Sequence, residues 1–310
     1  MPAAPAVLLG DDVVGTSAVA RAPPEEWHLP ETIRTLIDRR ESSGPPVLPD
    51  KLRIAYGGDL WFPPSGTRPY VIGNFVSTVD GVVSYEIAGK SGGGDISGFD
   101  ESDRFIMGLL RASADAVMVG SGTLHETAPD HLFVADRVYP QARDLYARYR
   151  SEILKKTAPP LHVVVSGSGR VDLTRAIFRT SGIRTLIVTT QAGRDLLAAS
   201  GVGSLVSTDV RALEGPIIAP ASMLELLSAR FGVSLLLQEG GPTLFGRFVA
   251  DGCVDELFLT IAPQVAGRNM PPLRPGFIAG VEFLPETAPW LDIVSVKQRG
   301  NHLYLRYRAA

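Results

Sequence analysis

The sequence predicts an α/β protein with a mostly parallel central sheet, flanking helices and an antiparallel hairpin at the C-terminal end. Short apolar runs without polar alternation recur along the chain, and helical patterns separate them. Unbroken apolar runs are typical of strands that are buried on both faces of a parallel sheet. The chain has 310 residues, of which 45% are hydrophobic. This is enough apolar material for a sizeable core.

Six apolar runs are the predicted strands of the parallel part. They are 70–76, Ala116–Gly120, Leu161–Ser166, Thr185–Thr190, 234–238 and Glu256–Ala262. The C-terminal segments 290–296 and 302–308 flank Lys-Gln-Arg-Gly-Asn. Two strand-like segments around such a turn predict an antiparallel hairpin that closes the sheet.

Three helices are predicted between the strands. Segment 102–112 carries Phe105, Ile106, Leu109 and Leu110 at helical spacing. Ser222-Met-Leu-Glu225 has the pattern of a capping box, which predicts a helix from Ser222 to about residue 230. Segment Pro242–Ala250 begins with a proline at the first helical position and has one apolar face.

The division expected along the chain is an N-terminal arm, 1–67, and one main domain, 68–310. The arm contains three Pro-Pro pairs, one helical pattern at 30–40 and one short apolar run at 52–56 that predicts a strand. Its first 25 residues fit either an extended arm or a partly disordered tail.

In the main domain, the basic, tyrosine-bearing segment 137–158 predicts an amphipathic surface helix, with a phosphate-contacting flap as the alternative.

Composition excludes several classes of function. The net charge is −3 with no basic cluster, so neither a nucleic-acid nor a membrane partner is expected. No apolar run approaches the ~20 residues of a membrane span, and no signal peptide is recognisable, which predicts a cytoplasmic protein. The only cysteine, Cys253, is expected to be a small buried hydrophobe. The five histidines show no metal-ligand spacing, so no metal is expected.

Two nucleotide-binding patterns can be set aside. Ala88-Gly-Lys-Ser91 ends like a P-loop, but Ser84 stands where the first glycine of that motif belongs and no strand directly precedes it. No G-x-G-x-x-G follows the first strand, so the Rossmann fingerprint is absent as well.

Glycine-rich turns follow two of the predicted strands. Ser121-Gly-Thr123 comes after Ala116–Gly120, and Glu239-Gly-Gly-Pro-Thr243 comes after 234–238 and leads into a helix. Glycine lets a backbone approach a ligand closely, and free N–H groups at a helix start favour phosphate. Because ligands of open α/β sheets bind outside the carboxyl ends of strands, these two turns predict a ligand site.

These motifs, in this order, resemble the riboflavin-pathway reductase family. The resemblance runs from about Arg68 to Arg308 and includes the reductase domain of the bifunctional deaminase–reductase, 5-amino-6-(5-phosphoribosylamino)uracil reductase, and its stand-alone relatives. The motifs are Arg68-Pro-Tyr-Val-Ile72 with Ser77-Thr-Val-Asp-Gly81, Ile96-Ser97 before a helix that ends Leu110-Arg-Ala-Ser-Ala-Asp-Ala116, Val119-Gly-Ser-Gly-Thr123, Glu239–Thr243 and Val254-Asp-Glu-Leu257.

The resemblance implies a dihydrofolate-reductase-like fold, NADPH as cofactor and a homodimer. The cofactor-binding positions that it implies are Gly120, Thr123, Ser166, Gly240, Gly241, Pro242, Thr243 and Leu244. Arg170, close to Ser166, is added as a partner for the 2′-phosphate that distinguishes NADPH from NADH. Arg111 and Glu239 match substrate-contacting positions, with Asp80 and Glu239 as the catalytic carboxyl groups. Hydride delivery to a C=N bond creates an amine that needs a proton, so a carboxyl group beside the substrate suits this chemistry. We expect Asp80, Arg111 and Glu239 to converge on one cleft.

One departure from the family leaves the substrate open. Relatives follow Gly-x-x-Thr with an Asp-Asp/Asn-Pro-x-Leu-x-x-Arg stretch, whereas this chain has Thr127-Ala-Pro-Asp-His-Leu-Phe-Val134. Arg137 is a possible replacement for the missing arginine. Three functions are therefore retained: reduction of a ribosylaminopyrimidine, reduction of dihydrofolate, another pterin or another small imine or carbonyl, and nucleotide binding without catalysis.

Overall fold

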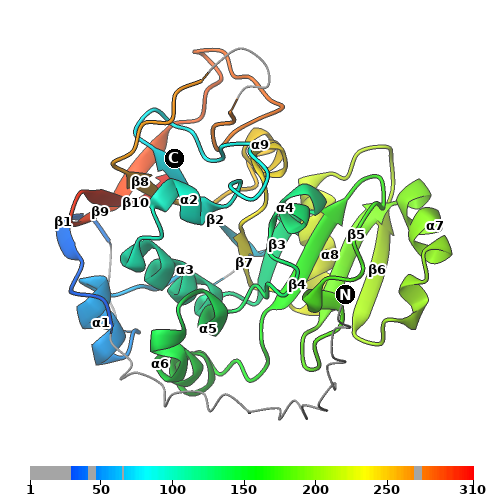
Figure 1. Ribbon diagram of the computed structural model, residues 1–310, viewed down its shortest axis with the longest axis horizontal. Coiled ribbons are helices and arrows are strands. Elements are labelled where there is room, and N and C mark those ends of the chain that lie inside the picture. Colours follow the sequence, from blue (N-terminus) through cyan, green and yellow to red (C-terminus); the bar gives the residue numbers. More distant parts are fainter. Residues whose placement is uncertain (1–28, 41–46, 65, 269–273) are drawn as a thin grey trace, which may run out of the picture.

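One mixed sheet organises the molecule (Figure 1). The computed structural model describes residues 29–40, 47–64, 66–268 and 274–310. The ten strands found in these residues are ordered β1-β9-β10-β8-β2-β7-β3-β4-β5-β6. The parallel strands are β2 (Tyr70–Thr78), β3 (Ala116–Gly120), β4 (Leu161–Ser166), β5 (Thr185–Thr190), β6 (Thr208–Leu213), β7 (Leu235–Gln238) and β8 (Glu256–Ala262). The antiparallel edge consists of β1 (Arg34–Asp38), β9 (Leu291–Arg299) and β10 (His302–Ala309). The predicted fold class is confirmed.

Both faces of the parallel strands are buried, which explains their unbroken apolar sequences. In β7, Leu235 and Leu237 pack into the core on one face of the sheet, and Leu236 packs into a second core on the other face. A strand alternates its side chains between the two faces. A strand that is covered on both sides therefore needs apolar residues at every position.

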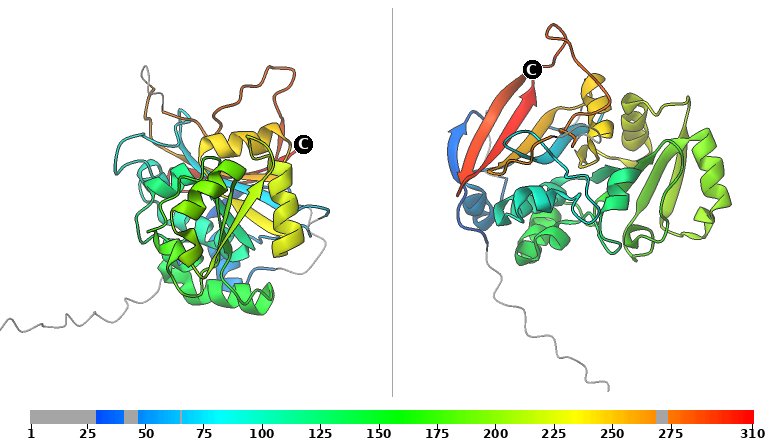
Figure 2. Two further views of the ribbon diagram at one scale, coloured as in Figure 1. Left: turned by 90° about the vertical axis from the view of Figure 1, so that its right-hand side faces the viewer. Right: turned by 45° about the horizontal axis from the view of Figure 1, so that its top comes forward.

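Helices form a layer on each face of the sheet (Figure 2). The first core is shared with α1 (Asp50–Tyr56), α3 (Glu101–Ser113), α4 (Ser121–Glu126), α6 (Arg143–Arg148) and α7 (Gln191–Ala199). The second core is shared with α8 (Pro220–Phe231) and α9 (Pro242–Ala250). The short elements are α2 (Gly93–Ser97), α5 (Ala135–Val138), η1 (Pro140–Ala142), η2 (Tyr149–Ile153), η3 (Ala176–Phe178) and η4 (Val202–Ser204).

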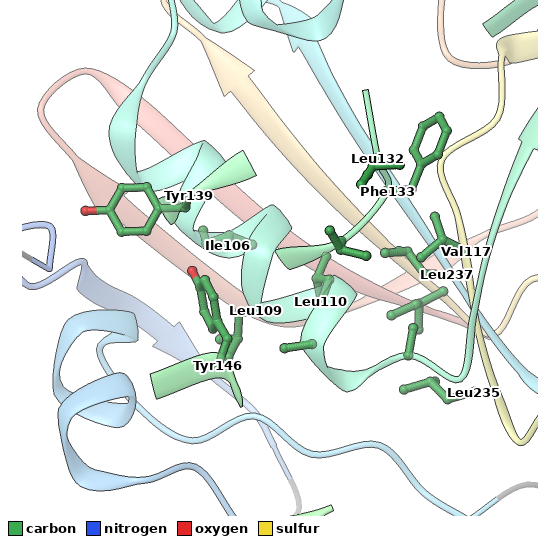
Figure 3. Packing of buried hydrophobic residues seen from close by; sticks show 14 of the residues in the cluster. Ile106, Leu109, Leu110, Val117, Leu132, Phe133, Tyr139, Tyr146, Leu235 and Leu237 are labelled. Carbon is green, nitrogen blue, oxygen red and sulfur yellow. The ribbon is translucent and has the colours of Figure 1, made fainter. Parts of the chain in front are cut away.

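Helix α3 lies against the strands through the apolar face that its sequence predicts. Ile106, Leu109 and Leu110 lie in the same core as Val117 of β3 and Leu237 of β7 (Figure 3). Asp100 caps the start of the helix by accepting a hydrogen bond of 2.8 Å from the Asp103 N–H. Such a cap satisfies one of the donors that a helix start leaves free.

Segment 137–158 is largely helical, as expected, and it packs against α3. Its tyrosines Tyr139, Tyr146 and Tyr149 are buried in the core of that face. Two of its cations bind the carboxyl end of α3: Arg150 donates to the Ala112 and Ala114 carbonyls, and Lys156 donates to the Ser113 carbonyl. These contacts satisfy carbonyls that the helix end leaves free. Arg150 and Lys156 thus serve the fold rather than a phosphate.

Two predictions for the arm are wrong. The expected helix at 30–40 is strand β1, and the expected strand at 52–56 is helix α1. Thr32, Ile33, Thr35 and Ile37 make the first segment rich in β-branched residues, and pairing with β9 decides in favour of a strand. The second segment ends at Gly57, whose φ of 69° terminates the helix in the left-handed conformation. Residues 1–28 lie outside the described residues.

Two further elements differ from the sequence reading. The capping box at Ser222 is wrong because α8 begins at Pro220, with Ala219 as its N-cap. Proline at the first helical position starts the helix two residues earlier. Strand β6 was not predicted, because it forms one edge of the sheet and its half-exposed sequence Thr-Asp-Val-Arg-Ala-Leu lacks an apolar run. Among the described residues, no helix is both long and apolar enough to cross a membrane, and no cluster of metal-ligating side chains occurs.

Candidate active site

The two glycine-rich turns predicted from the sequence lie side by side at the carboxyl ends of β3 and β7. The Glu239 N–H donates to the Met118 carbonyl at 2.9 Å, which joins the two strand ends. Gly240 is so close to Gly120 that a Cβ built on it would lie 3.0 Å from the Gly120 nitrogen. Helix α4 starts after Gly120, and α9 starts after Gly241. Two helix starts, each with free N–H groups, therefore share this edge of the sheet.

A cavity of roughly 1270 Å³ opens beside these turns. Its lining includes Gly120, Thr123 and the whole turn from Glu239 to Leu244. Pockets for single small ligands usually measure about 300–1,000 Å³. The cavity is therefore large enough for a dinucleotide together with a small second molecule.

Helix α3 forms another wall of this cavity. Asp103, Arg104, Met107 and Arg111 all line it. Residues four positions apart on a helix share one face, so Asp103, Met107 and Arg111 form a stripe that faces the cavity while the apolar face of α3 packs on the sheet. The sequence analysis identified Arg111 but missed Asp103, although the four-residue spacing of the two charged side chains with Met107 was a usable signal.

Arg111 and Glu239 form a buried ion pair at the cavity. Arg111 Nε lies 3.2 Å and 3.1 Å from the two Glu239 carboxylate oxygens, and Nη2 lies 2.9 Å from Oε2. The two side chains are only 4% and 8% exposed. The third guanidinium nitrogen, Nη1, is buried and has no hydrogen-bond partner in the part of the chain that the structure describes. An unpartnered buried donor is costly, so this atom is a candidate contact for a ligand in the cavity.

The segment that departs from the family contributes aromatic side chains to the same place. His131 and Phe133 line the cavity, and the Arg111 guanidinium carbon lies 5.4 Å from the centre of the Phe133 ring. The Phe133 N–H donates to His162 Nε2 at 3.0 Å, which anchors this segment to β4. Burial lowers the pKa of His131 to about 3, so its imidazole is neutral at physiological pH.

Asp80 does not join Arg111 and Glu239, so the expected convergence of all three is wrong. Asp80 is absent from the cavity lining, and its carboxylate accepts hydrogen bonds from Thr78 Oγ1 at 2.6 Å, the Ala266 N–H at 3.1 Å and the Gly267 N–H at 2.7 Å. These bonds lower the pKa of Asp80 to about 2. Asp80 follows β2 in an Asp-Gly turn, where an aspartate commonly binds nearby backbone N–H groups. It therefore joins the end of β2 to the loop after β8.

Ser166 is the last residue of β4 and Arg170 lies in the loop that follows it, but neither lines the cavity. The Ser166 hydroxyl is buried and donates to the Arg170 carbonyl at 3.3 Å. Gly167 of the same loop does line the cavity, together with Pro216, Ile217 and Ile218 from the loop that follows β6. The sequence analysis missed this second loop because β6 itself was not recognised. Cys253 is buried and unpaired, as expected of a small hydrophobe.

The sheet is thus mixed, with an antiparallel edge, and the cavity lies at the carboxyl ends of the parallel strands. The RibD C-terminal domain model matches residues 69–304. The 2,5-diamino-6-ribosylamino-4(3H)-pyrimidinone 5′-phosphate reductase of Archaeoglobus fulgidus is 30% identical over 67% of this chain and 87% of its own length. The chain therefore belongs to the RibD C-terminal domain family.

Solved structures share the fold. A pyrimidine reductase-like protein from Corynebacterium diphtheriae aligns over 78% of this chain and 92% of its own, with 19% identity and a TM-score of 0.60. Acinetobacter baumannii RibD aligns over 79% of this chain with 18% identity and the same TM-score of 0.60. This chain covers 59% of that longer protein.

Proposed function

We propose that this protein reduces a phosphorylated ribosylaminopyrimidine with NADPH, as a reductase of riboflavin biosynthesis. The proposal rests on one observation: the two glycine-rich turns and the buried Arg111–Glu239 pair line the same cavity. The name of the Archaeoglobus fulgidus relative supports the choice of a pyrimidinone 5′-phosphate as substrate. We retain the division into an arm, 1–67, and a reductase domain, 68–310.

The cofactor would bind along the turns after β3 and β7. Backbone N–H groups of Gly120, Gly240 and Gly241 and the hydroxyl groups of Thr123 and Thr243 would hold its pyrophosphate, with Pro242 and Leu244 shaping the turn. The turn after β7 packs closely against α4, because a Cβ built on Gly241 would lie 3.0 Å from Thr123 Oγ1. When bound, NADPH supplies the hydride. Gly167, Pro216 and Ile217 provide an apolar place for the adenine at the other end.

The substrate would lie between α3 and the turn after β7. Arg111 Nη1 is free to donate to a carbonyl or phosphate oxygen, and Glu239 is held in place by the other two guanidinium nitrogens. Because the pair is neutral as a whole, further positive charge is needed for a phosphate. Arg104 and Arg137 line the same cavity and would supply it.

The experiment that tests the proposal measures NADPH oxidation with two candidate substrates. We expect turnover with 2,5-diamino-6-ribosylamino-4(3H)-pyrimidinone 5′-phosphate or its deaminated form, and none with dihydrofolate. Turnover of dihydrofolate alone would select the pterin-type reductase. NADPH binding without turnover of either compound would select the non-catalytic nucleotide-binding protein.

Substitution of Gly241 tests where the cofactor binds. Gly241→Val should raise the Kd for NADPH by tenfold or more while the protein remains folded, because the new side chain presses on Thr123 where the pyrophosphate would approach. Isothermal titration calorimetry measures the affinity. Gly203→Val is the matched control, since no atom lies within 4 Å of a Cβ at Gly203 and this residue does not line the cavity. Equal affinity of the two variants would remove the pyrophosphate from this turn.

Substitution of Arg170 tests the preference for NADPH. Arg170 is exposed and lies three residues after Gly167, so its guanidinium can reach a ligand at this end of the cavity. Arg170→Ala should raise the KM for NADPH several-fold and leave the KM for NADH unchanged, because only NADPH carries the 2′-phosphate. Equal changes for both cofactors would place the 2′-phosphate elsewhere.

We also propose a homodimer and a cytoplasmic location. Strand β1 is an edge strand, and its Leu36 and Ile37 are exposed, which suits pairing with a second copy. Sedimentation velocity measures the oligomeric state, and Leu36→Lys should shift the protein toward monomer. Cell fractionation tests the location.

A further inference from the structure

Asp103 is a buried carboxyl group in the cavity to which no role has been assigned. It is 6% exposed, lines the cavity and stands in the first turn of α3, two helical turns before Arg111. An acidic residue in the first turn of a helix commonly directs its carboxylate back toward the helix start. Burial raises the pKa of Asp103, whereas the side chains of Thr260 on β8 and Ser97 on α2 lower it.

The charges around Asp103 do not compensate a buried carboxylate. Among the described residues, no arginine or lysine forms an ion pair with it. The neighbouring charged groups are Asp100, at the start of α3, and His302, on β10, whose Nδ1 lies 3.7 Å from Asp100 Oδ2. A buried carboxyl group without a cation favours its protonated form. Burial accordingly raises the pKa of Asp103 to about 6.

The other carboxyl groups of the cavity are paired or exposed. Glu239 contacts the Arg111 guanidinium through both oxygens, whereas Glu86 and Glu126 are exposed and Asp95 is partly exposed. Asp80 lies outside the cavity lining. The family's acidic stretch is replaced by Thr127–Val134, which brings a neutral histidine and a phenylalanine into the cavity. Among the carboxyl groups of the cavity, Asp103 is therefore the one that is buried without a cation beside it.

We infer that Asp103 is the general acid of the reduction. This inference rests on the proposed function. NADPH, when bound, would supply the hydride that forms a C–H bond at the carbon of the substrate C=N group. The π electrons move to the nitrogen, which takes the proton of the Asp103 carboxyl group directly or through one water. Asp103 is left as a carboxylate and is protonated again from solvent through the open cavity, and the nicotinamide is left oxidised.

Asp103→Asn tests the assignment, because it keeps the size of the side chain and removes the transferable proton. We expect kcat to fall about 100-fold or more while the Kd for NADPH changes less than twofold. The wild-type kcat should fall as pH rises above about 6, and this dependence should be absent from the variant. Asp144→Asn is the matched control: Asp144 is an exposed carboxyl group in the first turn of α6, outside the cavity lining, and its variant should retain the wild-type kcat and pH profile.

Thr260→Val provides a second variant that retains the acid. The Thr260 hydroxyl lowers the pKa of Asp103, so its removal should move the midpoint of the kcat profile to higher pH without abolishing turnover. A kcat of Asp103→Asn within threefold of wild type, or an unchanged midpoint in Thr260→Val, would overturn the assignment.

A measurement without turnover separates this inference from the proposed function. Infrared difference spectra of the NADPH-free protein should show a protonated carboxyl band that titrates between pH 5 and 7. The band should be absent from Asp103→Asn and present in Asp144→Asn. Lack of the band in wild type would overturn the role of Asp103. Presence of the band without turnover of the pyrimidine would instead contradict the proposed substrate.

Discussion

Arg111 and Glu239 are 128 residues apart in the chain, and within the described ranges neither forms an ion pair with any other residue. A buried ion pair adds little net stability, but removing one partner leaves an uncompensated charge in the interior. The pair therefore acts mainly by holding two side chains in a fixed arrangement beside the cavity. Arg111 Nη1 remains free for a ligand as a result.

A double-mutant cycle measures this coupling. Arg111→Met should lower the free energy of unfolding by about 3 kcal/mol, because Glu239 would be left buried without its cation. Arg111→Met combined with Glu239→Leu should recover most of that loss, because both charges are then gone. Urea denaturation of the ligand-free protein measures both values. Additive losses in the double variant would show that the two side chains are not coupled.

At the scale of elements, α3 determines the geometry of the site because it carries different residues on its two faces. The apolar face packs on the sheet and on segment 137–158, and the other face presents Asp103, Met107 and Arg111 to the cavity. Close packing on one side thus fixes the position of the polar groups on the other. At Gly108, α3 and α6 approach each other closely, because a Cβ built there would lie 2.7 Å from the Tyr146 hydroxyl of α6.

Gly108→Ala tests this packing. Alanine is the better helix former by about 1 kcal/mol, yet the new methyl group would collide with a buried ring whose hydroxyl donates to the Phe105 carbonyl at 2.8 Å. Overpacking of a core costs about 1–3 kcal/mol, so we expect a net loss of stability. Thermal unfolding measures it. Gly122→Ala in α4 is the control, because no atom lies within 4 Å of its Cβ, and it should be neutral or stabilising. A more stable Gly108→Ala would indicate that α3 and α6 are loosely packed.

At the scale of the whole molecule, the N-terminal segments are part of the same core as the parallel sheet. Leu52 and Tyr56 of α1 pack in the main core, and β1 extends the sheet next to β9. Lys297 of β9 binds both N-terminal segments: its ammonium group donates to Thr35 Oγ1 at 2.7 Å and to the Gly57 carbonyl at 2.8 Å. Burial lowers the pKa of Lys297 to about 8. Between pH 8 and 10, the unfolded chain therefore binds more protons at this position than the folded chain does.

The pH dependence of stability follows from that difference. The contribution of Lys297 to the free energy of unfolding should rise with pH between 8 and 10, by about 2 kcal/mol at most. Below pH 8 the full penalty of a buried ammonium group is present. Lys297→Met should lose this rise, whatever its effect on stability at a single pH. Urea denaturation at pH 8, 9 and 10 compares the slopes, and parallel slopes would contradict the pKa shift.

The local pattern of the sequence was sufficient for six of the seven parallel strands that the structure describes, for α3 and for α9. Unbroken apolar runs occur where both faces of a strand are covered, and glycines occur where the turns after β3 and β7 need close approach. Strand β1, helix α1 and strand β6 were misread or missed, because their conformation depends on pairing and packing with segments far away in the chain.

For the site, the sequence by itself determined which turns meet at one edge of the sheet, because each glycine-rich turn follows a predicted strand and the carboxyl ends of parallel strands share one edge. Only the tertiary structure decided which side chains face the cavity. In the folded chain, Asp80 accepts hydrogen bonds from the backbone of the loop after β8, and Arg111 forms an ion pair with Glu239. Asp103 is buried without a counter-ion among the described residues. The physical reason is that the partner of a polar side chain depends on what lies opposite it in space, which is set by contacts between residues distant in the sequence.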